Sequence, residues 1–258
     1  MTPISAVIIT KNEAQNIARC LTSLAGVADE IVVVDSHSSD ETENICKRFG
    51  VRFISHSWEG YSASKNFGNA QASHNWILSL DADEALSPEL KSAIIELKKN
   101  DHLQLASFHR LTNYCGHWVK YGGWYPDTKT RLFSRQNTQW KGILHEELQS
   151  SVPQKTVLLK GDCLHYSYYS REQHYRQAQN FSSIAAKELY EAEKKAKFHK
   201  RYLSPLVKFI RDYFIKLGFL DGATGFTIAR ISAYATFLKY HKLHLLHKNF
   251  SKDSNKNK

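Results

Sequence analysis

A chain of 258 residues with 42% hydrophobic residues can form one large domain and an appendage, which excludes a fibrous or largely disordered protein. Its four cysteines contain no CxxC pair, which argues against a disulfide framework or a zinc knuckle and suits a reducing compartment. The net charge of +10 is uneven, because residues 1–170 hold 17 basic and 18 acidic residues whereas residues 171–258 hold 18 and 7.

The basic excess of the last 88 residues, +11, predicts an anionic partner for that region, either a membrane surface or a nucleic acid. The N-terminal residues lack a basic segment followed by a long apolar stretch, so we expect no secretory signal and a cytoplasmic location.

Strands and helices alternate over residues 1–103. The β-rich runs are residues 4–10, 30–35, 51–55 and 76–80. Helices are expected to start at Asn12, which has Gln15 three residues on, at the capping-box sequence of residues 38–41, at Ser62 and at Ser87 before Pro88. This order predicts an α/β fold with a mostly parallel sheet that binds its ligand beyond the carboxyl ends of the strands.

The later part of the chain differs in composition and in its expected secondary structure. Residues 104–169 combine short strands with many aromatic residues, which predicts a mixed-sheet half that closes over a site. Residues 170–250 are helical and basic, with one long helix expected over residues 171–199, and residues 251–258 form a polar end that we expect to be disordered.

Three carboxylates follow predicted strands at the edge where such a sheet binds ligands. Asp35 ends the second strand, and Asp81 and Asp83 follow the fourth. Two carboxylates this close can bind Mg²⁺ or Mn²⁺ together with a diphosphate, although an isolated DxD is more often an Asx turn.

Several segments together resemble the family-2 glycosyltransferases of GT-A type. They are Val7–Glu13, Val32–Thr42, Ala63–Asn66 and Leu80–Glu84. More narrowly, Gly122–Asp127, Arg131–Phe133, His145–Glu146, Asp221 and Tyr240 resemble the branch that glucosylates the inner-core heptose of bacterial lipopolysaccharide.

The resemblance implies a role for each matching residue at the donor site. Thr10 and Glu13 would line the nucleoside, Asp35 would hydrogen-bond the base or ribose, and Lys65 would approach the diphosphate. Asp81 would hold the ribose or a metal-bound water, and Asp83 would bind the metal. Each of these residues could instead be structural: Thr10 and Asp35 could end strands, Glu13 could stabilise a helix N-terminus, and Lys65 could be a surface charge.

An inverting transfer needs a carboxylate base for the acceptor hydroxyl. Glu146, in the late acidic motif of the family, is the candidate, and Asp127, after Pro126, is its rival. His165 follows the motif where related enzymes add a metal ligand, and a hydrogen-bonded core histidine is an equally good interpretation. His145 could orient the base.

The tail contains no stretch of about twenty uninterrupted apolar residues, so it should not span a membrane. In residues 206–216 apolar side chains recur at helical spacing with basic residues between them, as in a helix lying in a membrane interface. The alternative is a helix packed on the enzyme with a solvated basic face.

Taken together, the sequence predicts a metal-dependent inverting hexosyltransferase, peripheral on the inner face of the cell membrane. By resemblance its donor is UDP-glucose and its acceptor a lipid A-core heptose, and another UDP-sugar or another glycolipid or polysaccharide acceptor remains open. A nucleotidyltransferase would need a Gly-rich loop where residues 10–13 stand. A nucleic-acid-binding protein acting through the basic tail would leave the strand-end carboxylates unexplained, so no nucleic-acid partner is expected.

Overall fold

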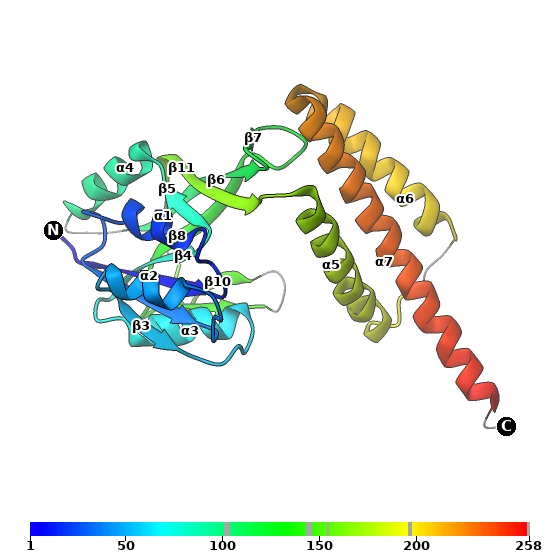
Figure 1. The fold of residues 1–258 in the computed structure, drawn as a ribbon, viewed down its shortest axis with the longest axis horizontal. Coiled ribbons are helices and arrows are strands. Elements are labelled where there is room, and N and C mark those ends of the chain that lie inside the picture. Colours follow the sequence, from blue (N-terminus) through cyan, green and yellow to red (C-terminus); the bar gives the residue numbers. More distant parts are fainter. Residues whose placement is uncertain (101–103, 143–145, 154, 196–197, 257–258) are drawn as a thin grey trace. The chain divides into compact units, whose positions relative to one another are not determined.

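The computed structural model describes residues 1–100, 104–142, 146–153, 155–195 and 198–256 (Figure 1). The chain forms two compact units. The first contains residues Met1–Leu111 and Pro126–Tyr166, and the second contains Thr112–Tyr125 and Ser167–Lys258.

The first unit begins with the predicted alternation of strands and helices. Parallel strands lie in the order β3-β2-β1-β4. They are β1 (Ile4–Thr10), β2 (Glu30–Asp35), β3 (Arg52–Ser55) and β4 (Trp76–Asp81), with helices α1 (Ile17–Ser23), α2 (Thr42–Arg48), α3 (Tyr61–Gln71) and α4 (Pro88–Lys98). The β-branched runs of β1 and β2 are almost wholly buried, as expected of strands covered on both faces.

The sheet continues with a mixed half in the order β8-β6-β11-β5, in which β8 runs antiparallel to β4. These strands are β5 (Glu84–Leu86), β6 (Leu105–Tyr114), β8 (Asp127–Ser134) and β11 (Thr156–Tyr168), and β9 (Thr138–Lys141) pairs separately with β10 (Glu147–Ser150). The predicted α/β class with a mixed second half is therefore confirmed.

Alternate side chains of the parallel strands supply two apolar clusters. Ile4 and Ile8 of β1 belong to one cluster, and Val7 and Ile9 belong to the other. Burying each such side chain contributes roughly 1.5–3 kcal/mol, so these two clusters fix the sheet and with it the strand ends.

Two predicted helix starts are wrong. Asn12 adopts a left-handed conformation and accepts a hydrogen bond from the Ser39 amide, and α1 begins only at Ile17. Ser38 donates its hydroxyl proton to Asp35, and α2 begins at Thr42 without a side-chain cap. The Ser87 cap of α4 is confirmed, because its hydroxyl accepts the Leu90 amide proton.

The second unit combines a short strand with helices. β7 (His117–Val119) pairs with the end of β6, and helices α5 (Arg171–Glu191) and α6 (Phe198–Ile210) pack against α7 (Gly222–Lys256). A π-helical turn η1 (Arg211–Ile215) and a 3₁₀ turn η2 (Gly218–Asp221) connect α6 to α7 (Figure 1).

Two details of this unit bear on the predicted tail. α5, the first helix of the tail, ends at Glu191 and not near residue 199 as predicted. α7 extends to Lys256, and disorder of residues 251–258 stays a prediction. Among the described residues we find no helix with the length and apolarity needed to cross a bilayer.

Candidate active site

Three predicted site residues end neighbouring parallel strands. Thr10 pairs with Asp35, and Ile9 beside it pairs with Asp81, so these ends lie at one edge of the sheet. Asp35 is buried and accepts hydrogen bonds from the amide and hydroxyl of Ser38, at 2.8 and 2.5 Å. The hydroxyl of Thr10 is buried and has no hydrogen-bond partner within the described part of the chain. A ligand hydrogen-bonding to Thr10 would remove the cost of that unpaired group.

Lys65 lies beneath the site as a buried cation. Its side chain is 1% exposed, and its Nζ lies 2.8 Å from Glu146 Oε1 and 3.1 Å from Asp81 Oδ1. One ammonium group therefore joins the DxD segment to the late acidic motif, which are 65 residues apart in sequence. A diphosphate could contact the Lys65 ammonium group only on the side that Asp81 and Glu146 leave uncovered.

Arg131 is a second buried cation, and the sequence did not predict its role at the site. Its Nη2 lies 3.2 Å from both Asp81 Oδ2 and Glu84 Oε1. Burial alone would raise the pKa of Asp81, but Lys65 and Arg131 outweigh burial and hold that pKa well below its ordinary value. Asp81 is therefore ionised at any physiological pH.

Arg131 and Glu84 both belong to segments that carry the family resemblance, but the sequence assigned neither of them a role at the site. Arg131 opens the Arg-x-Phe segment, and Glu84 follows the DxD directly. The pairing of β8 with β4 and β6 brings Arg131 to Asp81, which sequence spacing alone does not reveal.

Asp83 and His165, the two predicted metal ligands, are brought together. β5 and β11 pair with His165 opposite Glu84, and His165 Nε2 lies 3.1 Å from Asp83 Oδ2. Burial disfavours the imidazolium, yet the Asp83 carboxylate raises the pKa of His165 above its ordinary value.

The Asp83 carboxylate is the kind of oxygen ligand that Mg²⁺ and Mn²⁺ prefer, and the His165 nitrogen lies close enough to it to share one ion. No cluster of three or more histidine, cysteine or acidic side chains able to hold a metal occurs in the described residues. The pair fits an ion that takes its other ligands from a diphosphate and water.

Glu13 lies in the turn before α1, where Asn16 donates a hydrogen bond of 2.7 Å to its carboxylate. Burial raises its pKa to about 7, and the nearby charges of Asp83 and Asp40 add to the increase. The structure thus places Glu13 in the electrostatic field of the two predicted metal ligands.

The rival base candidates have different partners. Asp127 forms an ion pair with Arg110 at 2.7 Å and another with Lys129 at 3.0 Å. Burial acts to raise the pKa of Asp127, but these cations hold it below its ordinary value, which weakens a base. Within the described part of the chain, Glu146 forms its ion pair with Lys65 at 2.8 Å. His145 lies outside the described residues.

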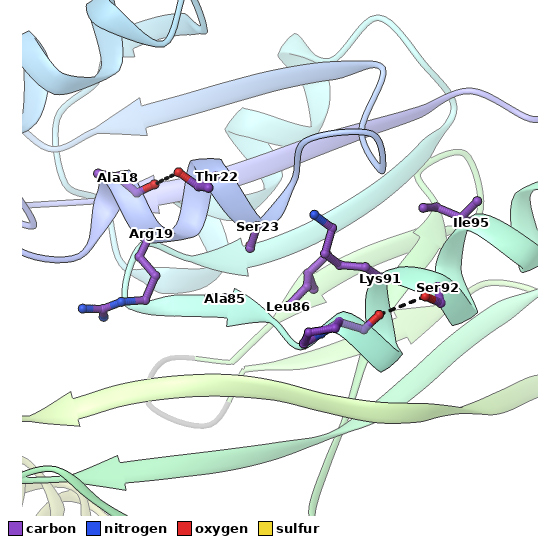
Figure 2. Close-up of a pocket in the computed structure, with 10 residues that line it drawn as sticks. Ala18, Arg19, Thr22, Ser23, Ala85, Leu86, Lys91, Ser92 and Ile95 are labelled. Carbon is purple, nitrogen blue, oxygen red and sulfur yellow. Dashed lines mark hydrogen bonds between the residues drawn. The ribbon is translucent and has the colours of Figure 1, made fainter.

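A separate pocket of about 670 Å³ opens between α1, β5 and α4 (Figure 2). Its walls include Thr22, Leu86 and Ile95, with Lys91 on α4 and Arg19 on α1. None of the predicted site residues lines it, so this pocket and the strand-end site are distinct.

The sequence of this chain matches the model of glycosyl transferase family 2 over residues 5–151. It is 35% identical to a glycosyltransferase of Rickettsia felis over 94% of this chain and 90% of the relative. It is 28% identical to the lipopolysaccharide core biosynthesis glycosyltransferase LpsC of Rhizobium meliloti over 95% of this chain and 93% of that protein.

Among solved structures, one similar chain is S. aureus TarS 1-349 in complex with UDP. The TM-score is 0.47 at 16% identity, covering 98% of this chain and 92% of that chain. The family match spans the parallel strands, the DxD segment and the late acidic motif, and the chain therefore belongs to glycosyl transferase family 2, with a GT-A fold followed by helices.

Proposed function

We propose that this glycosyltransferase transfers a hexose from a UDP-sugar to a saccharide hydroxyl with inversion at the anomeric carbon. The observation that carries the proposal is the contact of one buried ammonium group, Lys65, with both Asp81 and Glu146. This contact supports the proposal because it brings the carboxylate of the late acidic motif to the Asp81 end of β4, where the proposed metal and diphosphate would lie and a base would be needed.

The proposed donor site uses the strand ends. Thr10, Glu13 and Asp35 line the nucleoside, and Asp81, fixed by Lys65 and Arg131, binds the ribose or a metal-bound water. Asp83 and His165 hold Mg²⁺ or Mn²⁺, which when bound neutralises charge on the leaving diphosphate.

In the proposed reaction Glu146 accepts the proton of the acceptor hydroxyl as its oxygen attacks the anomeric carbon. The bond from that carbon to the diphosphate oxygen breaks, and the diphosphate leaves with the electron pair. Attack opposite the leaving group converts an α-linked donor into a β-glycoside. Asp127 is the second candidate base.

The acceptor is proposed from the relative whose name specifies one. LpsC acts in lipopolysaccharide core biosynthesis by its name, and we infer a heptose of the lipid A core as acceptor and UDP-glucose as donor. We further propose that residues 1–169 form the catalytic domain and that the basic residues 170–250 hold it on the inner face of the cell membrane.

Incubation of the purified protein with UDP-, GDP- and dTDP-sugars, with Mn²⁺, Mg²⁺ or EDTA, tests this proposal. We expect metal-dependent consumption of one UDP-hexose, lost in Asp83→Ala and Glu146→Gln. If no nucleotide-sugar is bound or consumed with any metal, the donor-site assignment is wrong.

A further inference from the structure

Helix α6 exposes an apolar face that no other described helix of its unit covers. Leu203, Leu206, Val207 and Ile210 are 57, 55, 61 and 41% exposed. Their spacing of three, four and seven residues places them on one side of the helix. Folded proteins rarely leave a row of this kind in water without a use for it.

The turn after α6 extends this apolar surface. Ile215 is 72% exposed, and Leu217, Phe219 and Leu220 are also exposed. Leu217 has a φ of 58°, a left-handed conformation that costs a leucine free energy. We call α6 with η1 and η2, residues 198–221, the anchor segment.

The anchor segment buries its acidic side chains and exposes basic ones. Its acids, Asp212 and Asp221, are buried. Asp212 forms ion pairs with Lys208 at 2.5 Å and Arg211 at 2.9 Å, and Asp221 accepts hydrogen bonds from the Lys120 and Tyr121 amides. The exposed side chains of the segment are therefore apolar or cationic. Arg211 and Lys216 are two of the exposed cations.

Close backbone contacts hold the turn in shape. A Cβ atom at Gly218 would lie 2.6 Å from the Asp212 carbonyl oxygen, and one at Gly225 would lie 1.8 Å from the Gly218 carbonyl oxygen. The Gly122 amide also donates to the Lys216 carbonyl at 2.9 Å. The apolar tip is preformed, so little ordering free energy would be lost on binding.

We propose that the anchor segment inserts its apolar side chains into the interface of an anionic bilayer, with Arg211 and Lys216 at the level of the lipid phosphates. Apolar insertion combined with cations is the pattern of interfacial helices. A second copy of the chain fits less well, because a symmetric contact through this surface would bring the same cations together. The inference deepens the proposed function, which requires access to a glycolipid acceptor.

A fluorescent probe reports insertion directly. Ile215→Cys is labelled with an environment-sensitive dye in full-length protein carrying Cys115→Ser, since Cys115 is exposed whereas Cys20, Cys46 and Cys163 are buried. The matched control is a label at Leu158→Cys, on β11, which is 58% exposed. Both are mixed with vesicles of phosphatidylglycerol and phosphatidylethanolamine.

We expect a blue shift at position 215 and none at position 158, and the shift should persist in about 0.5 M salt, where electrostatic attraction is screened. Loss of the shift at that salt would favour a purely electrostatic contact, and no shift at any salt would mean that Ile215 does not enter the bilayer; either result overturns the inference. A shift without vesicles that grows with protein concentration would show instead that a second copy covers the surface.

Vesicle sedimentation gives an independent test. Leu206→Glu with Val207→Glu should lower the partition coefficient by roughly tenfold or more, and Leu158→Glu should leave it unchanged. Donor consumption without vesicles separates the two proposals: turnover without insertion overturns only the anchor, and insertion without turnover overturns only the enzymatic assignment.

Discussion

Lys65 has a fully buried ammonium group, and two carboxylates offset the cost of burying its charge. It also lies 5.0 Å from the centre of the Trp140 ring, whose π-face favours a cation. A buried cation with fixed partners holds Glu146 in place before substrate arrives, and such preorganisation is what a catalytic base requires.

The base assignment gives the first prediction. Glu146→Gln keeps the size of the side chain and removes the proton acceptor, so kcat should fall by roughly 100- to 10,000-fold while UDP binding is kept. Asp127→Asn should cost less, because Arg110 and Lys129 already weaken Asp127 as a base. Steady-state kinetics of both variants test this assignment. A larger fall of kcat in Asp127→Asn than in Glu146→Gln would make Asp127 the base.

The metal assignment gives the second prediction. Asp83→Asn removes the charged oxygen that faces His165 and should weaken Mn²⁺ binding by roughly 10-fold or more, since amides are poorer ligands than carboxylates. Isothermal titration with Mn²⁺ and UDP measures it, with Glu89→Gln on the exposed start of α4 as control. Unchanged affinity in Asp83→Asn would remove this residue from the metal site.

The raised pKa of Glu13 predicts how stability depends on pH. Its pKa is about 7 in the folded protein and 4.5 ordinarily, so the folded state binds the proton more tightly. The free energy of unfolding should therefore fall as pH rises from about 4.5 to 7. Because Glu13 is partly exposed, the loss is on the order of 2 kcal/mol or less.

Glu13→Gln removes this titration. In EDTA the variant should match the wild type near pH 4.5 and be more stable than it at pH 8, as urea unfolding at both pH values would measure. An equal stability difference at the two pH values would contradict the assignment.

At the scale of elements, local sequence signals and tertiary contacts compete for the same polar groups. The capping-box sequence of residues 38–41 does not cap α2, because Asp35 and Asn12 engage Ser38. The Ser87 cap forms although a second donor is present, because the Ser87 hydroxyl oxygen accepts hydrogen bonds from both the Leu90 amide and the Asp162 amide.

The packing of α3 on the sheet gives a prediction for stability. A Cβ atom at Gly68 would lie 2.6 Å from Val7 Cγ1 and 2.9 Å from Val34 Cγ2. Gly68→Ala should therefore lower the free energy of unfolding by about 1–3 kcal/mol, despite the better helix propensity of alanine. Denaturant unfolding checks this, with Gln71→Ala on the last turn of α3 as control. A more stable Gly68→Ala variant would mean that α3 can shift away from the valines.

At the scale of the whole molecule, the residues of the proposed chemistry and those of the proposed membrane contact belong to different compact units. Donor binding should therefore survive Leu206→Glu with Val207→Glu, and vesicle binding should survive Asp83→Ala. Paired measurements of UDP affinity and vesicle sedimentation on both variants test this independence. Loss of both properties in either variant would show that the units do not work separately.

The chain passes between the two units at residues 111/112, 125/126 and 166/167, and the second of these passages follows a loop that Asp221 holds. Asp221 accepts hydrogen bonds from residues 120 and 121, and the chain then runs through Gly122 and Gly123 to Asp127 at the start of β8. Residues 112–125 therefore group with the C-terminal helices, although they lie within the part of the sequence that was expected to form a mixed sheet.

The sequence by itself determined the family, the order of the parallel strands along the chain and the strand-end carboxylates. It could do so because buried β-branched runs and short motifs are local in the chain. The matching segments from Val7 to Glu84 were readable for the same reason, and so was the basic excess of the tail.

Only the tertiary structure decided which charges meet. Lys65 with Glu146 and Arg131 with Asp81 are separated by 50 residues or more in the chain, and so are Asp83 and His165, for which the family resemblance had suggested a shared metal but not their direct contact. Their contacts depend on strand pairing and on the packing of α3, which no short motif encodes. The tertiary structure also showed that the acids of the anchor segment are buried and its apolar residues exposed, because burial depends on contacts between distant parts of the chain.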